Sequence, residues 1–384
     1  MEYNSERKDK LWGILKDKLK DRLKYVLFIE LKKDLVLKNN LCIKKDVLLP
    51  IKSEYLLNGI KTGEYIDSIK LNEIISSIIF VMGSDSSFKY NDSYLKILMD
   101  YDNKIENYIL KNALEYAKKR KYFDSIVYFN ALSFTHKKEK EIKYNTAIVL
   151  KEMAEQSLKN KNRKDYRLYH DLSFYIFFEL KRQYPDFPYS GFYLGFYYAE
   201  EKEYDMALKI WGDSYRALGD PKYKDKLKRL MDAVSAQRDF EHAKQSIDSN
   251  HIEEALRILI PLIEKYDKWS EAIYYTALAY RKVENYAKAE LLLNNLLKNG
   301  ECFSEIYNEL GLCKFFTGDI EDSIKYFEKA VHIKRDNAEY LCNLALAYSE
   351  NGEHDKAMKM INEAYDKAPD DDIIKQSKQL IENR

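Results

Sequence analysis

The residues that could do chemistry are few, and packing or turn formation explains each of them. The segment VMGSDSS, residues 81–87, places Gly, Ser and Asp after an apolar run. It has neither the GxSxG of a nucleophilic serine nor the glycines and lysine of a phosphate-binding loop, and a helix that ends in a turn predicts the same residues. The six histidines include no HExxH motif and no pair at i and i+4, so a zinc site is not indicated. We therefore expect no catalytic residues, no metal site and no cofactor.

The four cysteines also lack a reactive spacing. Cys42, Cys302, Cys313 and Cys342 form no CxxC pair, and three of them fall within helical periodicity. We expect these three to be reduced, buried thiols.

Two basic segments remain as candidates for recognition. They are KNKNRKDYR, residues 159–167, and KYKDKLKR, residues 222–229. Lysines clustered on a long helix usually form a solvated face, and 64 Lys and Arg against 63 Asp and Glu leave the whole chain at +1. Nucleic acid is therefore not favoured as a partner, and whether these two segments bind anything is left open.

The elements that carry these residues are predicted to be helices. Only 6 Pro and 12 Gly occur in 384 residues, which favours long uninterrupted helices and an all-α class. The N-terminus alternates charges without the apolar core of a signal peptide, and the longest apolar stretch, residues 74–82, is about half a membrane span. We expect a cytoplasmic protein with no membrane partner.

A repeat of 34 residues organises the C-terminal half. Units begin at Ala236, Ser270, Ser304 and Ala338 without insertion. Each unit has small residues at its eighth and twentieth positions and a bulky apolar residue one helical turn after the second of them. The members are Ala243, Ala277, Gly311 and Ala345; Ala255, Ala289, Ser323 and Ala357; and Leu259, Leu293, Phe327 and Ile361.

This pattern resembles the tetratricopeptide repeat family. In that family each 34-residue unit is a pair of antiparallel helices, A and B, which approach closely where their side chains are small. The resemblance implies a right-handed α-solenoid whose helices A line a concave groove. It also implies that the partner is a protein or a peptide.

Looser units extend the pattern toward the N-terminus. One begins at Pro188, where Gly191 and Gly195 predict close helix packing, and another begins at Glu106. Excesses of 14 residues predict an elongated helix pair, 139–159 and 165–184, and a long helix from Pro221 to about Ile247. The final segment, with Ile373, Ile374, Leu380 and Ile381 on one side, predicts a capping helix that Asp370 to Asp372 would favour at its start.

The first hundred residues are less regular. Leucines recur every four residues from Leu11 to Leu27, which favours helix, whereas residues 34–45 are also compatible with a small hairpin around Asn39 and Asn40. Helices are predicted again over residues 53–60 and 68–82. The chain then divides into a helical N-terminal domain (1–104), divergent repeats with elongated helices (105–235), four regular repeats (236–371) and a capping helix (372–384).

The resemblance also indicates which side chains face the groove. Aromatic residues and side-chain amides in a concavity suit an extended peptide or a partner helix. An alternative left open for each aromatic is packing against the neighbouring helix A. The predicted groove residues are Tyr189, Phe192, Tyr193, Phe196, Glu271, Tyr274, Tyr275, Arg281, Lys282, Asn308, Glu309, Phe316 and Asn343.

These features favour a non-enzymatic scaffold or adaptor that binds a partner segment in the groove. A second hypothesis is a peptide-responsive regulatory sensor with residues 1–104 as its output domain. The sequence does not indicate the identity of the partner or the oligomeric state.

Overall fold

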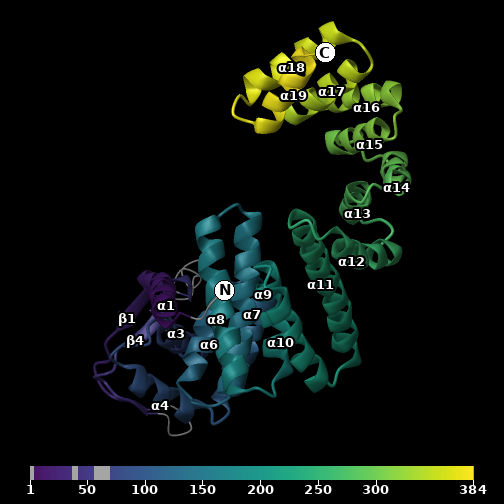
Figure 1. Ribbon diagram of the computed structural model, residues 1–384. Coiled ribbons are helices and arrows are strands. Elements are labelled where there is room, and N and C mark those ends of the chain that lie inside the picture. The colour runs from purple at the N-terminus through teal and green to yellow at the C-terminus, as the bar shows by residue number, and fades with distance from the viewer. Residues whose placement is uncertain (1–3, 37–41, 56–69, 384) are drawn as a thin grey trace. The chain divides into compact units, whose positions relative to one another are not determined.

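The computed structural model describes residues 4–36, 42–55 and 70–383, and α-helices dominate it (Figure 1). The chain divides into two compact units, residues 1–231 and 232–384. The predicted all-α repeat fold is confirmed. The four-part division of the chain stays a prediction.

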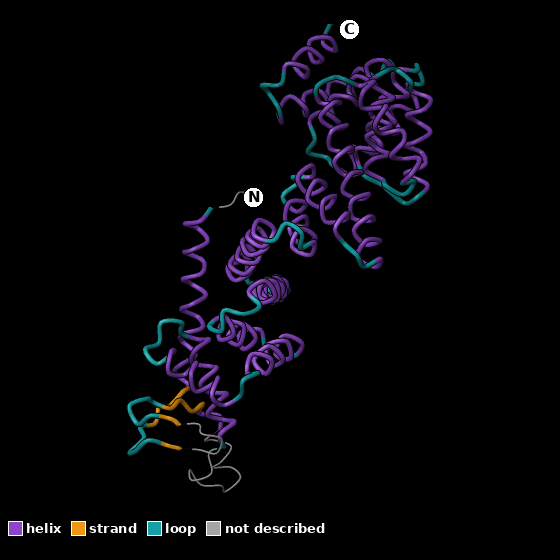
Figure 2. Tube along the Cα trace, turned by 90° about the horizontal axis from the view of Figure 1, so that it is seen from below, coloured by secondary structure: helices purple, strands orange, loops and turns teal. Residues whose placement is uncertain are grey.

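Unit 1 begins with a helix followed by short strands, where a longer helix was expected. Helix α1 (Ser5–Lys20) continues as a 3₁₀ helix, η1 (Asp21–Tyr25), and then the chain becomes extended. The strands are β1 (Val26–Ile29), β2 (Leu35–Val36), β3 (Cys42–Ile43) and β4 (Leu49–Lys52), drawn in orange in Figure 2. The helix predicted from the leucine pattern is therefore wrong beyond Leu23. The run Val-Leu-Phe-Ile favours strand, and Leu27 is 54% exposed.

The strands form two antiparallel pairs. β1 pairs with β4, with Val26 opposite Lys52 and Ile29 opposite Leu49. β2 pairs with β3, as the hairpin alternative predicted, although Asn39 and Asn40 lie outside the described residues. Most of the helix expected over 53–60 also lies outside them. All four residues of β4 are buried, and this strand packs against α3 (Leu71–Ser84), which falls largely within the helix expected over 68–82.

The VMGSDSS segment is a packing contact followed by a turn, as the alternative to chemistry predicted. Helix α3 crosses α6 (Tyr122–Ser133) so closely that a Cβ on Gly83 would lie 1.8 Å from the carbonyl oxygen of Val127. Asp85 ends α3, and its carboxylate accepts hydrogen bonds from the backbone N–H and the hydroxyl of Ser87. This pairing is that of a turn, in which the Asp85 side chain binds the backbone and the hydroxyl two residues further on.

Three helix pairs, α5 with α6, α7 with α8 and α9 with α10, form most of the rest of unit 1. The bounds are α4 (Asn91–Tyr101), α5 (Ile105–Lys118), α7 (Glu139–Lys159), α8 (Arg163–Gln183), α9 (Pro188–Glu200), α10 (Tyr204–Ala217) and α11 (Pro221–Asp248), the last of which extends into unit 2. The elongated pair α7–α8 and the long helix α11 are confirmed to within two residues at each end. A Cβ on Gly195 of α9 would lie 2.1 Å from the Trp211 ring of α10, so the predicted close packing is also confirmed.

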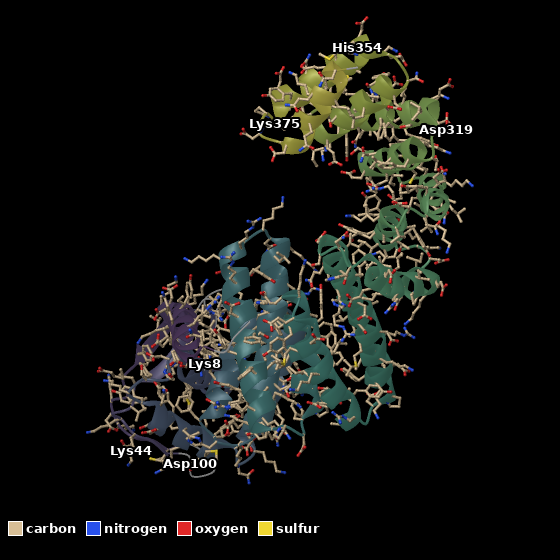
Figure 3. The ribbon with its side chains drawn as sticks, viewed as in Figure 1. Lys8, Lys44, Asp100, Asp319, His354 and Lys375 are labelled. Carbon is tan, nitrogen blue, oxygen red and sulfur yellow. The ribbon has the colours of Figure 1, made fainter. Side chains whose placement is uncertain are left out.

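Ion pairs hold α1 against α8. Arg7 contacts the carboxylate of Asp171, and Lys18 Nζ lies 2.9 Å from Asp165. Lys8, labelled in Figure 3, lies 2.6 Å from Glu179. Asp171 is buried, so its pairing with Arg7 avoids an uncompensated charge in the interior.

The buried end of this cluster contains an unusually basic histidine. The His170 ring lies 3.2 Å from Asp171 and 3.1 Å from Glu200, and its centroid is 4.8 Å from that of Tyr197. Burial opposes a charge on the imidazole, but hydrogen bonds to the two carboxylates outweigh it and raise the pKa of His170 to about 9. His170 is therefore a cation at neutral pH.

Raising the pH is expected to destabilise unit 1 as His170 loses its proton. Its pKa is 6.5 ordinarily and about 9 in the folded chain, so the stabilisation is complete below pH 6.5 and is lost as the pH rises through 9. We expect a loss on the order of 1–2 kcal/mol, because Glu200 is exposed and solvent weakens its interaction. Urea unfolding of wild type and of His170→Gln across this interval measures it. An equally steep pH dependence in the variant would contradict the assignment.

Unit 2 consists of regular helix pairs and a final helix. After α11 come α12 (Ile252–Lys265), α13 (Ser270–Lys282), α14 (Tyr286–Lys298), α15 (Ser304–Phe316), α16 (Ile320–Ile333), α17 (Ala338–Glu350), α18 (His354–Lys367) and α19 (Asp372–Glu382). The small repeat positions lie at the helix crossings: Ala277 and Ala345 are fully buried, and a Cβ on Gly311 would lie 2.6 Å from the Phe327 ring.

Helix α19 caps this unit, with one correction. Asp371 accepts hydrogen bonds from the backbone N–H groups of Ile373 and Ile374, and the helix packs on α17 and α18. Ile374 and Ile381 are buried, but Ile373 is 72% and Leu380 51% exposed. The buried stripe is therefore narrower than the sequence pattern predicted.

The cysteine prediction also needs a correction. Cys313 and Cys342 are buried as expected, whereas Cys302 is exposed in the linker before α15 and Cys42 is half-buried in β3.

Within the described part of the chain, each helix is too short or too polar to cross a membrane.

Candidate functional site

Three helices A of unit 2 form one continuous surface. Helix α13 contacts α15, and α15 contacts α17, while each also packs against its own helix B (Figure 1). Consecutive helices A must be neighbours if a repeat array is to present one lining. Most of the predicted groove residues of this unit lie on these helices.

An ion pair joins α13 to α15. The guanidinium of Arg281 contacts the Glu309 carboxylate, and the two side chains are only 18% and 8% exposed. Burial raises the pKa of Glu309, although the neighbouring Arg281 lowers it. Glu309 was predicted to face a ligand, but its carboxylate is occupied by Arg281. We therefore assign both residues to the interface between helices A.

A pair of amides joins α15 to α17. The Asn343 side chain donates a hydrogen bond of 2.9 Å to the side-chain oxygen, Oδ1, of Asn308. Asn308 is 3% exposed, so its amide cannot hold the backbone of a bound peptide. Its predicted role as a contact residue is corrected to packing, and Asn343 is half-buried beside it.

A cavity of about 360 Å³ opens between α13, the end of α14 and the start of α15. Side chains of both predicted and unpredicted residues line it. They are Ser270, Glu271, Tyr274, Leu296, Glu301, Phe303, Glu305 and Ile306. Four of the eight are apolar or aromatic and three are carboxylates, so the lining combines an apolar wall with negative charge.

The charges around this cavity are partly compensated. Glu271 lies 3.4 Å from Lys244, Glu305 lies 3.7 Å from Lys334, and Glu301 accepts a hydrogen bond of 2.8 Å from Ser270. The side chains of Glu271 and Lys334 are more than half exposed, so solvent weakens both pairs. Among the described residues, no group of three or more His, Cys, Asp or Glu is placed to hold a metal ion.

Of the predicted groove residues, Glu271 and Tyr274 line the cavity, and Tyr274 adds an aromatic ring to its wall. Burial raises the pKa of its hydroxyl, and the nearby Glu309 and Glu305 raise it further. The phenol therefore stays protonated and can donate a hydrogen bond at neutral pH. Its ring packs edge-on against Tyr275 at 5.6 Å.

Phe303 is the principal residue that the sequence reasoning missed. It precedes the first residue of its repeat and belongs to the linker between α14 and α15, where the repeat pattern assigns no role. It lines the cavity and is 57% exposed. A large aromatic residue in a linker was the available signal.

The remaining predicted residues of unit 2 lie outside this cavity. Tyr275 packs against Phe240 at 5.6 Å, with the Lys244 ammonium 5.1 Å from its ring. Phe316 is 56% exposed and stacks on Tyr286 of α14 at 5.8 Å. Lys282 is exposed at the end of α13.

The four predicted residues of unit 1 form an aromatic network on α9. Phe192 is 1% exposed, so it packs within the unit and cannot contact a ligand. Tyr193 stacks on Phe177 at 5.0 Å, and Phe196 meets Trp211 edge-on at 5.3 Å. Tyr189 lies 5.3 Å from Tyr223. The alternative of packing, left open for each aromatic, accounts for these contacts.

Comparison with known families matches part of the repeat region. Residues 303–370 match the family profile described as tetratricopeptide repeat. Similar solved structures include YrrB, reported as a TPR protein with an unusual peptide-binding site (15% identity, TM-score 0.38, 53% of this chain and 97% of that chain). Others are MamA (19% identity, TM-score 0.35, 47% and 91%) and a thermophilic TPR protein of Thermus thermophilus (16%, 0.34, 51% and 100%). No curated protein matched the sequence.

Proposed function

We propose that the chain is a tetratricopeptide repeat protein that acts as a non-enzymatic scaffold and binds a segment of a partner protein. The segment lies along α13, α15 and α17, with one side chain in the cavity at the start of α15. The cavity lining is the observation that carries this proposal. Mostly apolar concavities with a few fixed polar groups are the usual places where proteins bind ligands.

The composition of the cavity defines the partner segment. Leu296, Phe303 and Ile306 suit a bulky apolar side chain, because its burial removes apolar surface from water. Glu271, Glu301 and Glu305 favour Lys or Arg at neighbouring positions of the segment. The preferred segment therefore carries an apolar anchor flanked by basic residues.

The polar pairs between helices A support a scaffold role in a second way. Arg281 pairs with Glu309 between α13 and α15, and Asn343 donates a hydrogen bond to Asn308 between α17 and α15. Buried pairs of this kind fix how neighbouring helices align. A surface that is already organised loses little conformational entropy when a segment binds to it.

Phe303→Ala is expected to weaken binding of the preferred segment by about tenfold or more, because an aromatic anchor of the cavity is removed. Selection from a random peptide display library on the full chain identifies the segment, and fluorescence anisotropy then measures its affinity. Ile333→Ala is the matched control, since Ile333 is 50% exposed in the same unit but does not line the cavity.

Two outcomes would overturn this proposal. One is enrichment of acidic sequences, which would contradict the assigned charge preference. The other is an equal loss of affinity in Phe303→Ala and Ile333→Ala, which would place the binding surface elsewhere.

A further inference from the structure

Unit 1 contains two adjoining cavities that the repeat pattern does not explain. One, of about 310 Å³, is lined by residues of η1, β4, α3, α5 and the start of α6. The other, of about 550 Å³, extends from the start of α6 to the end of α7 and the start of α8. Arg22, Lys121 and Asp124 line both of them.

Arg22 has an unsatisfied donor here. Its Nη2 group donates to Asp124 at 2.7 Å, and its guanidinium lies 5.3 Å from the Phe80 ring centroid. Its Nη1 group is buried and has no hydrogen-bond partner among the described residues. A buried N–H of a charged group that lacks an acceptor carries a desolvation cost. The guanidinium as a whole supplies the positive charge that an anion in either cavity would meet, because Arg22 lines both cavities.

Lys52 brings a second, more deeply buried cation. Its side chain is 11% exposed, and its Nζ atom lies 4.8 Å from the Phe80 ring centroid. The nearest carboxylate, that of the exposed Glu54, is 3.6 Å away and beyond ordinary hydrogen-bond distance. Burial lowers the pKa of Lys52, which is the response of an ammonium with too few oxygen partners.

We propose that these cavities form a binding site for a phosphate-bearing small molecule. The phosphoryl group lies among Arg22, Lys52 and Lys121, and the rest of the molecule occupies the larger cavity. Three cations from η1, β4 and the N-cap of α6 line the smaller cavity against two carboxylates, Glu54 and Asp124. Charge-assisted donors from separate elements suit an anion with several acceptor oxygens.

The position at the start of α6 adds to this preference. Lys121 is the N-cap residue, and Tyr122 begins the helix, so the positive end of the helix dipole adjoins both cavities. The Asp124 carboxylate, in the first turn of α6, offsets part of this positive charge. It pairs with Nη2 of Arg22, whereas Nη1 of Arg22 has no hydrogen-bond partner among the described residues.

The larger cavity is lined by groups that suit the body of such a molecule. Gln156, Asn160 and Asn162 place amide groups here, although that of Asn162 is already hydrogen-bonded to Asp165, and Tyr122, Phe123 and Tyr169 provide aromatic rings. Asp165 also lines it but is paired with Lys18 at 2.9 Å. Two of these amides belong to the basic segment 159–167, whose role the sequence left open.

Isothermal titration calorimetry of the full chain tests the site with inorganic phosphate, with adenosine monophosphate and with vesicles containing phosphatidylglycerol. We expect phosphate and adenosine monophosphate to compete, and Lys121→Met to weaken both by about tenfold through loss of one charge-assisted contact. Lys118→Met is the matched control, because Lys118 is also exposed but lines neither cavity. Lys52→Met should weaken binding at least as much. If that variant fails to fold, Lys121→Met decides.

The three probes distinguish a soluble organic phosphate from a lipid headgroup. Tighter binding of adenosine monophosphate than of phosphate supports a soluble organic phosphate, with its body in the larger cavity. Vesicle binding that Lys121→Met removes supports a lipid headgroup at the same site. Absence of binding to all three probes overturns the proposal, as does binding that Lys121→Met and Lys118→Met reduce equally.

Discussion

Gly83→Ala is expected to lower the free energy of unfolding of residues 1–231 by about 4 kcal/mol or more. The added methyl carbon would lie 1.8 Å from the Val127 carbonyl oxygen and 2.6 Å from the carbonyl carbon. Both atoms belong to the backbone of α6, so no side-chain rotation can relieve the overlap. Helices α3 and α6 would have to separate, which would disrupt the apolar contacts around them.

Gly13→Ala provides the matched control. Gly13 lies within α1, and a Cβ there would meet nothing within 4 Å. Alanine should therefore stabilise the helix by about 0.5–1 kcal/mol. Urea unfolding followed by far-ultraviolet circular dichroism compares the two variants with wild type. An unchanged midpoint for Gly83→Ala would show that α3 and α6 are not packed as described.

Arg281→Met should destabilise unit 2 by about 3 kcal/mol, because the buried Glu309 carboxylate then has no cation beside it. The double variant Arg281→Met with Glu309→Leu should recover most of that loss. Replacing both members of a buried ion pair by apolar residues is often close to neutral, whereas removing one is not. The expected non-additivity follows directly from the contact between the two side chains.

Hydrogen–deuterium exchange of the amides of α13 and α15 can follow this unfolding, because Trp12 and Trp211 of unit 1 would add to the fluorescence of Trp269. Lys282→Met is the control for loss of a positive charge on the same helix, because Lys282 is exposed. A double variant as unstable as the single one would mean that the pair is not isolated from other buried polar groups.

The helix pairs were predictable because small residues recur in the sequence at the positions where two helices cross closely. A small residue is required wherever two helices cross closely, and Gly311 beside Phe327 shows that requirement in atomic detail. The 14-residue excesses kept the same phase, so the bounds of α7 and α11 were also predictable. Strand β1 was not, because its leucine fits the helical period while its neighbours favour an extended chain.

The candidate site was only partly predictable, for a different reason. A position in the repeat indicates which face of helix A a residue occupies, but it does not indicate what the next helix places opposite. Glu309 contacts Arg281, and Asn308 accepts a hydrogen bond from Asn343. Glu309 and Asn308 are therefore buried between helices instead of facing a ligand. Phe303 lies in a linker, where the repeat period carries no information about direction.

The polar pairs on α15 also limit how this array can change in evolution. Helix α15 presents Glu309 to the preceding repeat and Asn308 to the following one, and neither residue suits a neighbour without its particular partner. The apolar crossings would accept a repeat of the same length that keeps the small residues at its crossing positions. Duplicating, deleting or exchanging a repeat at this point would leave a buried charge or amide unpaired. The order of these repeats is therefore constrained by two hydrogen-bonded pairs, even though their helical architecture is modular.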